Sequence, residues 1–303
     1  MAKTINRTKE INPYDNFYTK YETIEEGLKT FLPFFKGKTI YCNCDDYRYS
    51  QFVVYFKNKF AEIGLSKLIA TCFNKDGQGL KYVKTEKSTH TYRLKGNGDF
   101  RSEECKKFLS EKDVVVITNP PFSLKEDFIC LMMNTGTPFL AILPQTTITI
   151  KKISKYVVKN QLWFGDGIEN GGTEFLLSKE YPLTAKCSRI DEKGNRYAVL
   201  SGIKWFTNID YQGRYKNDFK NTVRYKKTRY EKYDNMHGID VPKLSEIPHH
   251  YYGIMGVPTT FLFYYNPHRY RIIGFRKGLD GKDLSVNGKE VFARYLIQRI
   301  KAV

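Results

Sequence analysis

A run of β-branched residues that stops at two consecutive prolines constrains this chain most strongly. Residues 113–123 read DVVVITNPPFS, so an apolar run is followed directly by Asn119, Pro120, Pro121 and Phe122. Such a run predicts a buried strand, whereas proline cannot donate to a sheet ladder. Proline also fixes its own φ and keeps the preceding residue extended. The sequence therefore predicts a sheet in which a buried strand ends at a rigid turn.

Strand-like and helix-like segments alternate around that turn. Residues 38–44 and 67–73 are predicted strands, and residues 49–64 between them place apolar side chains on one helix face. Further predicted strands cover residues 114–118 and 138–143, again with helix-spaced residues between them. The alternation predicts a doubly wound α/β domain over about the first 180 residues. Ligands of such domains bind beyond the carboxyl ends of the strands.

The pattern changes along the chain in two places. Residues 74–90 are polar and rich in lysine, so we interpret them as an excursion from the sheet before a short strand near residues 92–94. From about Cys187 onward strand and helix no longer alternate, and Tyr, Lys and Arg crowd together. We therefore predict a boundary between a first domain, residues 1–186, and a second region, residues 187–303.

The proline turn offers chemistry suited to a planar amine. Asn119 supplies a side-chain acceptor, the backbone before it supplies carbonyls, and Phe122 supplies a flat face. Fixed acceptors beside a ring can hold both hydrogens of an exocyclic amino group while its heterocycle stacks. Methylation of such an amine by S-adenosylmethionine depends largely on alignment, and an amine inside a duplex must first be flipped out. The alternative interpretation is that Asn-Pro-Pro simply ends a strand.

The charge of the chain favours a polyanionic partner. It carries 50 Lys+Arg against 32 Asp+Glu, a formal net charge of +18, which concentrates nucleic acid around the protein. Cations and aromatic residues interleave between Tyr211 and Tyr233. The candidate nucleic-acid contacts there are Arg214, Lys216, Arg224, Lys226, Lys227 and Arg229. The alternative is a solvated loop or strand pair whose tyrosines belong to the core.

Metal, disulfide and membrane signals are weak. The six cysteines form no CxxC pair and the five histidines have no ligand spacing, so we expect reduced packing cysteines and no metal. The first ten residues are polar, and no apolar stretch is long enough to cross a bilayer. We expect a cytoplasmic monomer without a membrane partner.

Six blocks of the sequence, in order, resemble the EcoRI-type adenine-specific DNA methyltransferases. They are NPYDNFYT (12–19), KTIYCNCDD (38–46), GDFRSEEC (98–105), TNPPF (118–122), WFTNID (205–210) and YGIMGVPTTFL (252–262). The resemblance implies a Rossmann-like class I S-adenosylmethionine-dependent domain followed by a C-terminal target-recognition region. It also implies site-specific methylation of N6 of a flipped-out adenine in double-stranded DNA, within restriction-modification.

The resemblance further implies roles for single residues. The catalytic turn would be Asn119, Pro120, Pro121 and Phe122, and the cofactor would be bound by Phe17, Tyr18, Thr19, Asp45, Asp46 and Asp99. The glycine-rich loop that usually follows the first strand of methyltransferases is absent, since residues 43–46 read NCDD. Either aspartate of that loop could instead cap the following helix.

Other functions stay open at this point. The same turn could serve cytosine N4, an adenine of RNA or a glutamine amide of a protein, and an inactive relative would only bind DNA. Asp99 with Glu104 and Lys106 is similar to the acidic Glu-x-Lys set of metal-dependent nucleases. Those residues belong on a strand, however, and Cys105, Phe108 and Leu109 have helix spacing.

Overall fold

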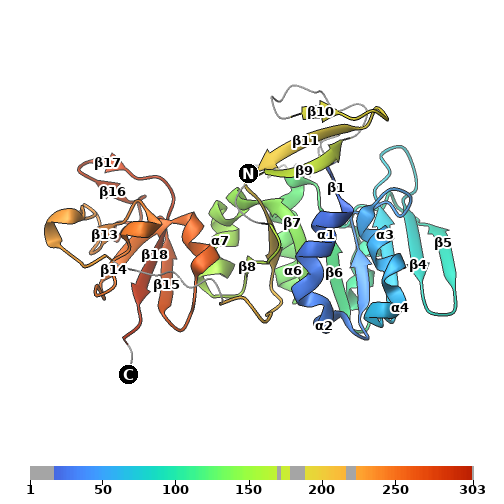
Figure 1. The fold of residues 1–303 in the computed structure, drawn as a ribbon, viewed down its shortest axis with the longest axis horizontal. Helices are drawn as coiled ribbons and strands as arrows, with labels where there is room; N and C mark the ends of the chain where they lie inside the picture. Colours follow the sequence, from blue (N-terminus) through green and yellow to red (C-terminus); the bar gives the residue numbers. More distant parts are fainter. Residues whose placement is uncertain (1–16, 169–171, 178–187, 216–222, 302–303) are drawn as a thin grey trace, which may run out of the picture. The chain divides into compact units, whose positions relative to one another are not determined.

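The computed structural model describes residues 17–168, 172–177, 188–215 and 223–301 (Figure 1). The chain forms two compact units: unit 1 is Met1–Thr147 with Gly165–Tyr211, and unit 2 is Ile148–Phe164 with Gln212–Val303. These units do not follow the division at residue 187. The difference arises because β12 (Ile203–Thr207) pairs with β7 (Phe139–Pro144) and so belongs to unit 1. The division by function at residue 187 stays a prediction.

Unit 1 is built around a mixed sheet, in which the order β5-β4-β3-β2-β6-β7-β12 holds. Four neighbouring strands run parallel, namely β3 (Lys67–Cys72), β2 (Thr39–Cys42), β6 (Val114–Thr118) and β7. Every residue of β2 and β6 is buried. The predicted α/β architecture and its buried central strands are therefore confirmed.

The helices of unit 1 are α1 (Tyr21–Leu28), α2 (Leu32–Phe35), α3 (Gln51–Asn58), α4 (Phe60–Ile63), α5 (Glu103–Lys106) and α6 (Lys125–Thr135). They include those predicted around residues 49–64, 105–109 and 128–132, whereas α1 and α2 were not predicted. Short 3-10 helices cover Lys29–Phe31, Lys107–Ser110, Phe122–Leu124 and Gln145–Thr149. Ser50 caps α3, because its hydroxyl accepts the N–H of Phe52 at 3.2 Å. The predicted helix over residues 49–64 is thus two helices that meet at Lys59.

Trp205 anchors α1 and α3 to the sheet. Trp205 and Phe206 are fully buried, and the Trp205 ring meets Phe52 edge-on at 6.0 Å. A Cβ at Gly27 would lie 2.0 Å from Trp205 Nε1, so only glycine lets α1 pack this closely. The block WFTNID therefore belongs, at its aromatic end, to the core of unit 1.

The interpretation of residues 74–90 as an excursion is wrong. They contain β4 (Leu80–Lys84) and the start of β5 (Thr89–Arg93), which extend the sheet antiparallel beyond β3. All five residues of β5 are exposed. An edge strand that is solvated on both faces has no alternation of apolar residues, so its sequence gives no strand signal.

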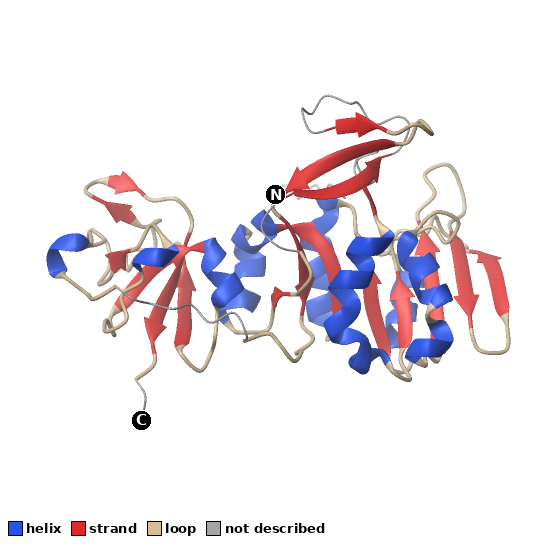
Figure 2. Cartoon of the chain, in the orientation of Figure 1, coloured by secondary structure: helices blue, strands red, loops and turns tan. Residues whose placement is uncertain are grey.

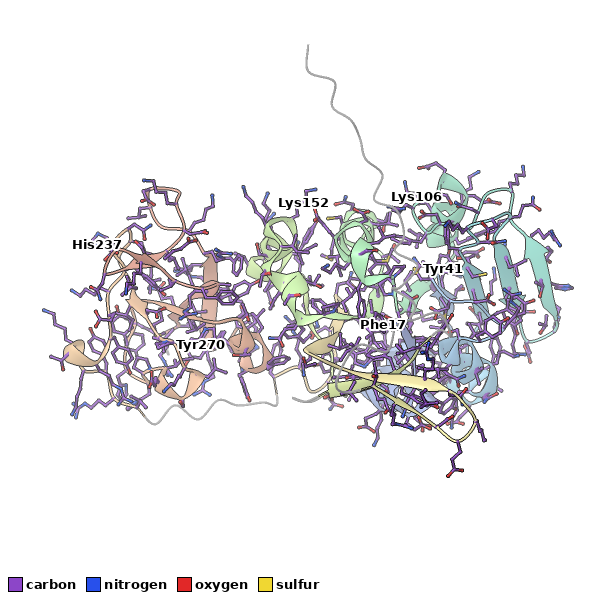
Figure 3. All side chains as sticks on the ribbon, turned by 90° about the horizontal axis from the view of Figure 1, so that it is seen from above. Phe17, Tyr41, Lys106, Lys152, His237 and Tyr270 are labelled. Carbon is purple, nitrogen blue, oxygen red and sulfur yellow. The ribbon has the colours of Figure 1, made fainter. Side chains whose placement is uncertain are left out.

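A second sheet of unit 1 contains the first described strand, and it lies beside the large sheet in Figure 2. Its order is β1-β9-β11-β10, formed by β1 (Phe17–Thr19), β9 (Gly172–Leu177), β11 (Arg196–Ser201) and β10 (Ser188–Ile190). β1 runs antiparallel to β9 with Thr19 opposite Phe175. Phe17 is thereby fixed by a strand that follows it by more than 150 residues (Figure 3).

Unit 2 has its own four-stranded sheet of order β13-β14-β18-β15. The strands are β13 (Ile239–Asp240), β14 (Ile254–Pro258), β18 (Arg294–Arg299) and β15 (Tyr270–Phe275). β16 (Ser285–Val286) pairs with β17 (Lys289–Glu290), and α7 (Lys151–Val158) packs against β15. β8 (Trp163–Phe164) and 3-10 helices over Lys227–Arg229, Leu244–Glu246 and Thr259–Tyr264 complete the unit. In the described ranges, no helix has the length and apolar character needed to span a membrane.

Candidate active site at the ends of β2 and β6

Two adjoining cavities lie where β2 and β6 end. The larger, about 410 Å³, is lined by Tyr18, Asp46 and Asp99 among others, and the smaller, about 60 Å³, is lined by Phe17, Thr19, Asp45 and Asn119. Both are lined by Tyr18, Cys44, Asp46 and Pro121. The larger volume falls in the range of small-molecule sites. Every predicted catalytic or cofactor residue except Pro120 and Phe122 lines one of the two cavities.

The Asn119 amide has a fixed orientation. Its Nδ2 donates a hydrogen bond to the backbone carbonyl of Phe17. Because a carbonyl can only accept, the amide nitrogen must face Phe17 and Oδ1 must face the other way. Asn119 Oδ1 is buried and has no hydrogen-bond partner among the described residues. The turn therefore holds one preoriented, unpartnered acceptor on a residue that lines the smaller cavity.

Thr19 adds a second buried oxygen to the smaller cavity. The residue is 4% exposed, and its Oγ1 likewise has no hydrogen-bond partner within the described chain. A buried polar atom without a partner costs free energy, and in native proteins it commonly marks a group that a ligand or water satisfies. Two residues that line the smaller cavity thus carry buried oxygens without partners.

The Phe122 ring is partly covered by other aromatic side chains. It stacks on Phe17 with centroids 5.3 Å apart and an interplanar angle of 21°, and Phe175 meets it edge-on at 6.5 Å. A base could use only the face that Phe17 leaves uncovered, unless Phe17 moves. Pro121 precedes the short helix at Phe122–Leu124, and its carbonyl accepts the N–H of Leu124 at 2.9 Å.

Asp45 ties three segments of the site together. Its Oδ1 accepts from Ser50 Oγ at 2.7 Å, and its Oδ2 accepts from Thr118 Oγ1 at 2.5 Å. Its own N–H donates to the Thr71 carbonyl at 3.1 Å. The alternative that Asp45 or Asp46 caps α3 is wrong, because Ser50 caps this helix. Asp45 instead accepts a hydrogen bond from the Ser50 hydroxyl. Asp45 thereby joins the end of β2, the start of α3 and the last residue of β6.

Burial sets the protonation of Asp45. Removal from water raises the pKa of Asp45 to about 6, although hydrogen bonds from Thr118, Ser50 and the Asn119 backbone act in the opposite direction. Asp46 differs, because burial alone would raise its pKa but hydrogen bonds from Arg48 lower it below the usual value. Two adjacent carboxyl groups of one loop thus have opposite tendencies to be charged.

Asp46 and Asp99 share an Asp-x-Arg arrangement that the sequence analysis missed. Arg48 Nε and Nη2 reach the Asp46 oxygens at 2.9 Å and 2.6 Å, and Arg101 Nε and Nη2 reach those of Asp99 at 3.0 Å and 2.7 Å. Each arginine also donates its backbone N–H to the same carboxylate, at 3.0 Å for Arg48 and 2.8 Å for Arg101. The repeated spacing, DYR at 46–48 and DFR at 99–101, was the available signal.

The residues of the nuclease alternative do not form a strand site. Glu104 lies in α5, and its carboxylate accepts the backbone N–H groups of Lys95 and Gly96, both at 2.9 Å. Lys106 pairs with Glu103 at 2.8 Å. No group of three His, Cys, Asp or Glu side chains placed to hold a metal ion occurs in the described part of the chain.

The predicted nucleic-acid contacts separate into three classes. Arg214 lies over the Trp163 ring, 3.4 Å from its centroid, and donates to the Asn160 side chain. Arg224, Lys226, Lys227 and Arg229 are exposed, whereas Lys216 lies outside the described residues. Tyr230 and Tyr233 are buried, in agreement with the alternative interpretation that the tyrosines of this region belong to the core. Contact of these cations with nucleic acid stays a prediction.

Comparison with known proteins links the chain to one family. The family described as "Adenine-specific methyltransferase EcoRI" matches residues 4–301. The type II methyltransferase M.EcoRI of Escherichia coli is 37% identical over 98% of this chain and 96% of its own length. M.MgeORF184P of Mycoplasma genitalium is 34% identical over 97% and 98%, and M.MpnI of Mycoplasma pneumoniae is 34% identical over 88% and 84%. No solved structure gives a significant match.

Proposed function

This chain belongs to the family of the adenine-specific methyltransferase EcoRI, and from that premise we propose that it methylates N6 of an adenine at a specific site in duplex DNA. The methyl donor would be S-adenosylmethionine, and the biological setting would be restriction-modification. The relatives are type II methyltransferases that match the chain over most of its length, which supports DNA as the substrate class. The adenine specificity follows the description of the family.

The observation that carries the proposal is the unpartnered oxygen of Asn119. Phe17 holds the amide so that Oδ1 can accept a hydrogen from an amino group placed in the smaller cavity. A hydrogen bond to one amino hydrogen shifts the nitrogen away from conjugation with its ring and toward a nucleophilic, tetrahedral geometry. Because this acceptor is fixed before the substrate arrives, alignment costs little at the moment of reaction.

The residues around the two cavities suit the proposed cofactor. The larger cavity has the volume for a nucleoside-sized ligand, and the carboxylates of Asp46 and Asp99 line it. Each arginine occupies only part of the acceptor capacity of its carboxylate, so both can still accept hydrogen bonds from a ligand. Thr19 Oγ1 offers a further acceptor. When bound, S-adenosylmethionine supplies an electrophilic methyl group.

We assign Asp45 a positioning role, in place of the cofactor contact that the resemblance implied. Both of its oxygens already accept hydrogen bonds inside the protein. Through its hydrogen bonds with Thr118 and Ser50, Asp45 fixes the position of the proline turn relative to the loop after β2. Phe122 would support the flipped-out base on the face that Phe17 leaves uncovered.

We also propose that the parallel core of unit 1 is a Rossmann-like cofactor domain. The order β3-β2-β6-β7 with α3 and α6 between strands supports this assignment, as does the position of both cavities beyond the carboxyl ends of β2 and β6. The part of residues 187–303 that lies in unit 2 would then recognise the target site.

The deciding experiment is methyl transfer to DNA. Purified protein is incubated with methyl-labelled S-adenosylmethionine and unmethylated plasmid, and the nucleosides are separated after digestion. We expect label in N6-methyladenine. Label in N4-methylcytosine or in protein would favour the other amine substrates, and cleavage of DNA without label would favour a nuclease.

Replacement of Asn119 tests the assigned catalytic acceptor. Asn119→Ala should lower kcat by about 10²- to 10³-fold, since one preorganised polar contact to the reacting group is lost. Binding of S-adenosylhomocysteine, measured by calorimetry, should change less than about threefold, because Asn119 is assigned to the base. Asn58→Ala, an exposed asparagine at the end of α3, is the matched control and should leave both values unchanged. Wild-type turnover by Asn119→Ala would remove the role.

A further inference from the structure

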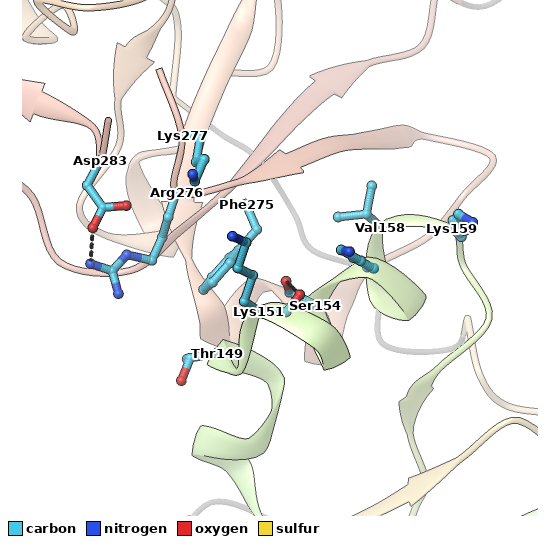
Figure 4. A pocket seen from close by; sticks show the side chains of 10 residues that line it. Thr149, Lys151, Ser154, Val158, Lys159, Phe275, Arg276, Lys277 and Asp283 are labelled. Atoms are coloured by element: carbon cyan, nitrogen blue, oxygen red, sulfur yellow. Dashed lines mark hydrogen bonds and ion pairs between the residues drawn. The ribbon is translucent and has the colours of Figure 1, made fainter. Parts of the chain in front are cut away.

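A separate cavity of about 400 Å³ lies within unit 2, between α7 and the end of β15 (Figure 4). We call it the α7 groove. Helix α7 and the residue after it contribute Lys151, Ser154, Lys155, Val158 and Lys159, and the chain at the end of β15 contributes Phe275, Arg276 and Lys277. Side chains from both segments face the same space in Figure 4. No part of unit 1 lines the groove, so it is a different site from the candidate active site.

The charge of the α7 groove is one-sided. Five cationic side chains line it, against the single carboxylate of Asp283. Asp283 is already paired, since Arg276 Nη2 lies 2.7 Å from its Oδ2. Lys151, Lys155, Lys159 and Lys277 are exposed and form no ion pair with any described residue. Four uncompensated ammonium groups therefore border one hollow.

The first lysine of α7 and the spacing of the lysine row are unfavourable for the helix, whereas Lys155 in the last turn and Lys159 at the C-cap stand where the macrodipole favours a cation. Lys151 stands in the first turn, where the helix macrodipole opposes a positive charge, and the first turn contains no acidic residue. Lys151, Lys155 and Lys159 follow at intervals of four, so they lie on one face and repel each other. Helical stability therefore explains neither Lys151 nor the alignment of the three lysines, whereas an anionic ligand on that face would relieve both penalties.

We propose that the α7 groove binds the phosphate backbone of DNA. This inference rests on the proposed function, because it takes duplex DNA as the polyanion that meets the protein. Lysines at intervals of one helical turn present a line of ammonium groups to a line of phosphates. Such contacts position the duplex without reading its sequence.

The structure assigns this role to α7 in preference to Arg214. The Arg214 guanidinium is engaged by the Trp163 ring and Asn160, whereas the ammonium groups of the groove face solvent. The α7 groove is not lined by any of the other exposed cations predicted to contact nucleic acid, which are Arg224, Lys226, Lys227 and Arg229. Substitution can therefore test the two sets separately.

The test is the salt dependence of DNA binding by the full chain. Lys151→Gln, Lys155→Gln and Lys159→Gln are combined, and the binding of a fluorescent 30-base-pair duplex of mixed sequence is followed by anisotropy at several salt concentrations. Loss of three phosphate contacts should reduce the slope of log K against log salt by about 2.7. Affinity at moderate salt should fall on the order of 10- to 100-fold.

The matched control removes the same charge elsewhere. Lys29→Gln, Lys36→Gln and Lys112→Gln replace three exposed lysines of unit 1, of which Lys36 and Lys112 precede β2 and β6 at the edge opposite the candidate active site. This triple variant should change the slope much less. Equal losses in both triple variants would show a general effect of net charge and overturn the proposal, as would wild-type binding by the α7 variant.

A second measurement uses the unmodified protein. Lysine acetylation by acetic anhydride, read by mass spectrometry, should be slowed at Lys151, Lys155, Lys159 and Lys277 when duplex DNA is present, and unchanged at Lys29 and Lys112. Equal acetylation with and without DNA at the groove lysines would overturn the proposal. Absence of methyl transfer to any DNA would refute the proposed function instead, and leaves this binding result to stand by itself.

Discussion

At the scale of single residues, the candidate active site is defined by oxygens that either lack partners or have several. Asn119 Oδ1 and Thr19 Oγ1 have none within the described chain, while both oxygens of Asp45 are occupied. Unpartnered buried atoms are costly unless a ligand satisfies them, and multiply bonded ones hold neighbouring segments in place. The two kinds of residue therefore have different expected responses to substitution.

Thr19→Val separates ligand binding from stability. Valine fills the same volume without the unsatisfied hydroxyl, so the melting temperature of the free protein should stay the same or rise. If Thr19 Oγ1 binds the cofactor, the Kd for S-adenosylhomocysteine should increase by about tenfold, which calorimetry measures. A lowered melting temperature with an unchanged Kd would contradict this role.

Thr207→Val is the control, and it should lower stability without changing cofactor binding. Thr207 Oγ1 donates to the Phe139 carbonyl at 2.6 Å and accepts the N–H of Ile209 at 3.0 Å. Its removal should lower stability by about 1–3 kcal/mol and leave the cofactor Kd unchanged, since Thr207 lies at the end of β12 that pairs with the start of β7.

Asp45→Asn should alter the pH dependence of stability. The pKa of Asp45 is raised from its ordinary 3.8 to about 6 by burial, so the native state holds this proton more tightly than the unfolded chain. Protonation of Asp45 therefore stabilises the folded protein fully below the ordinary pKa of 3.8, and this stabilisation is lost as the pH rises through the native pKa of about 6. The free energy of unfolding of the variant, relative to that of wild type, should increase by on the order of 3 kcal/mol as the pH rises from about 4 to about 8.

Urea unfolding at a series of pH values measures that gain. The informative quantity is the difference between the free energies of unfolding of the two proteins, because the titration of other groups cancels in it. A difference that stays constant across the pH range would mean that Asp45 titrates normally in the folded protein.

The sequence revealed the residues of the site better than it revealed their roles. Phe17 to Thr19, Asp46, Asp99 and Asn119 are all predicted from the sequence, and they meet around the two cavities. What could not be foreseen is contact across long chain separations. Phe175 packs on Phe17 and Phe122, and no local pattern in β9 signals that contact.

At the scale of elements, two glycines hold the loop that bears Asp99 against the end of β3. Gly98 has φ +82°, and a Cβ there would lie 2.1 Å from the Cys72 carbonyl oxygen. Gly79 approaches the Gly98 Cα closely enough that its own Cβ would lie 2.6 Å away. The close packing of these backbones sets where Asp99 enters the larger cavity.

Gly98→Ala should therefore damage both stability and binding. We expect a loss of about 2–4 kcal/mol from a disfavoured φ combined with the clash, together with weaker binding of S-adenosylhomocysteine. Gly136→Ala is the matched control, since Gly136 has φ +65° but nothing within 4 Å of the added Cβ. It should cost about 1–2 kcal/mol without an effect on binding. Equal losses in the two variants would refute the importance of the backbone contact.

Buried elements were predictable and edge elements were not. β2, β6 and β7 form continuous apolar runs because helices cover both faces of a parallel sheet. β4 and β5 extend the same sheet into solvent, so their lysines and tyrosines resemble a loop in composition. The return of β12 to the sheet was likewise hidden, because pairing with β7 is a property of the tertiary structure.

At the scale of the whole molecule, the cofactor product and DNA should protect different segments. Hydrogen exchange with S-adenosylhomocysteine should slow around residues 43–50 and 98–101 of unit 1, because a ligand stabilises the segments that it contacts. Duplex DNA should slow exchange in α7 and, through the flipped-out base, at Asn119 and Phe122. Protection by S-adenosylhomocysteine that is confined to unit 2 would place the cofactor site outside the cavities described above.

The pairing of β1 with β9 has a consequence for synthesis on the ribosome. Phe17, whose carbonyl orients the Asn119 amide, lies opposite Leu177. A nascent chain that has just exposed the whole proline turn therefore still lacks the strand that fixes its partner. Prematurely terminated products that end before Gly172 should not methylate DNA, because they lack β9, the strand that pairs with β1 and fixes Phe17.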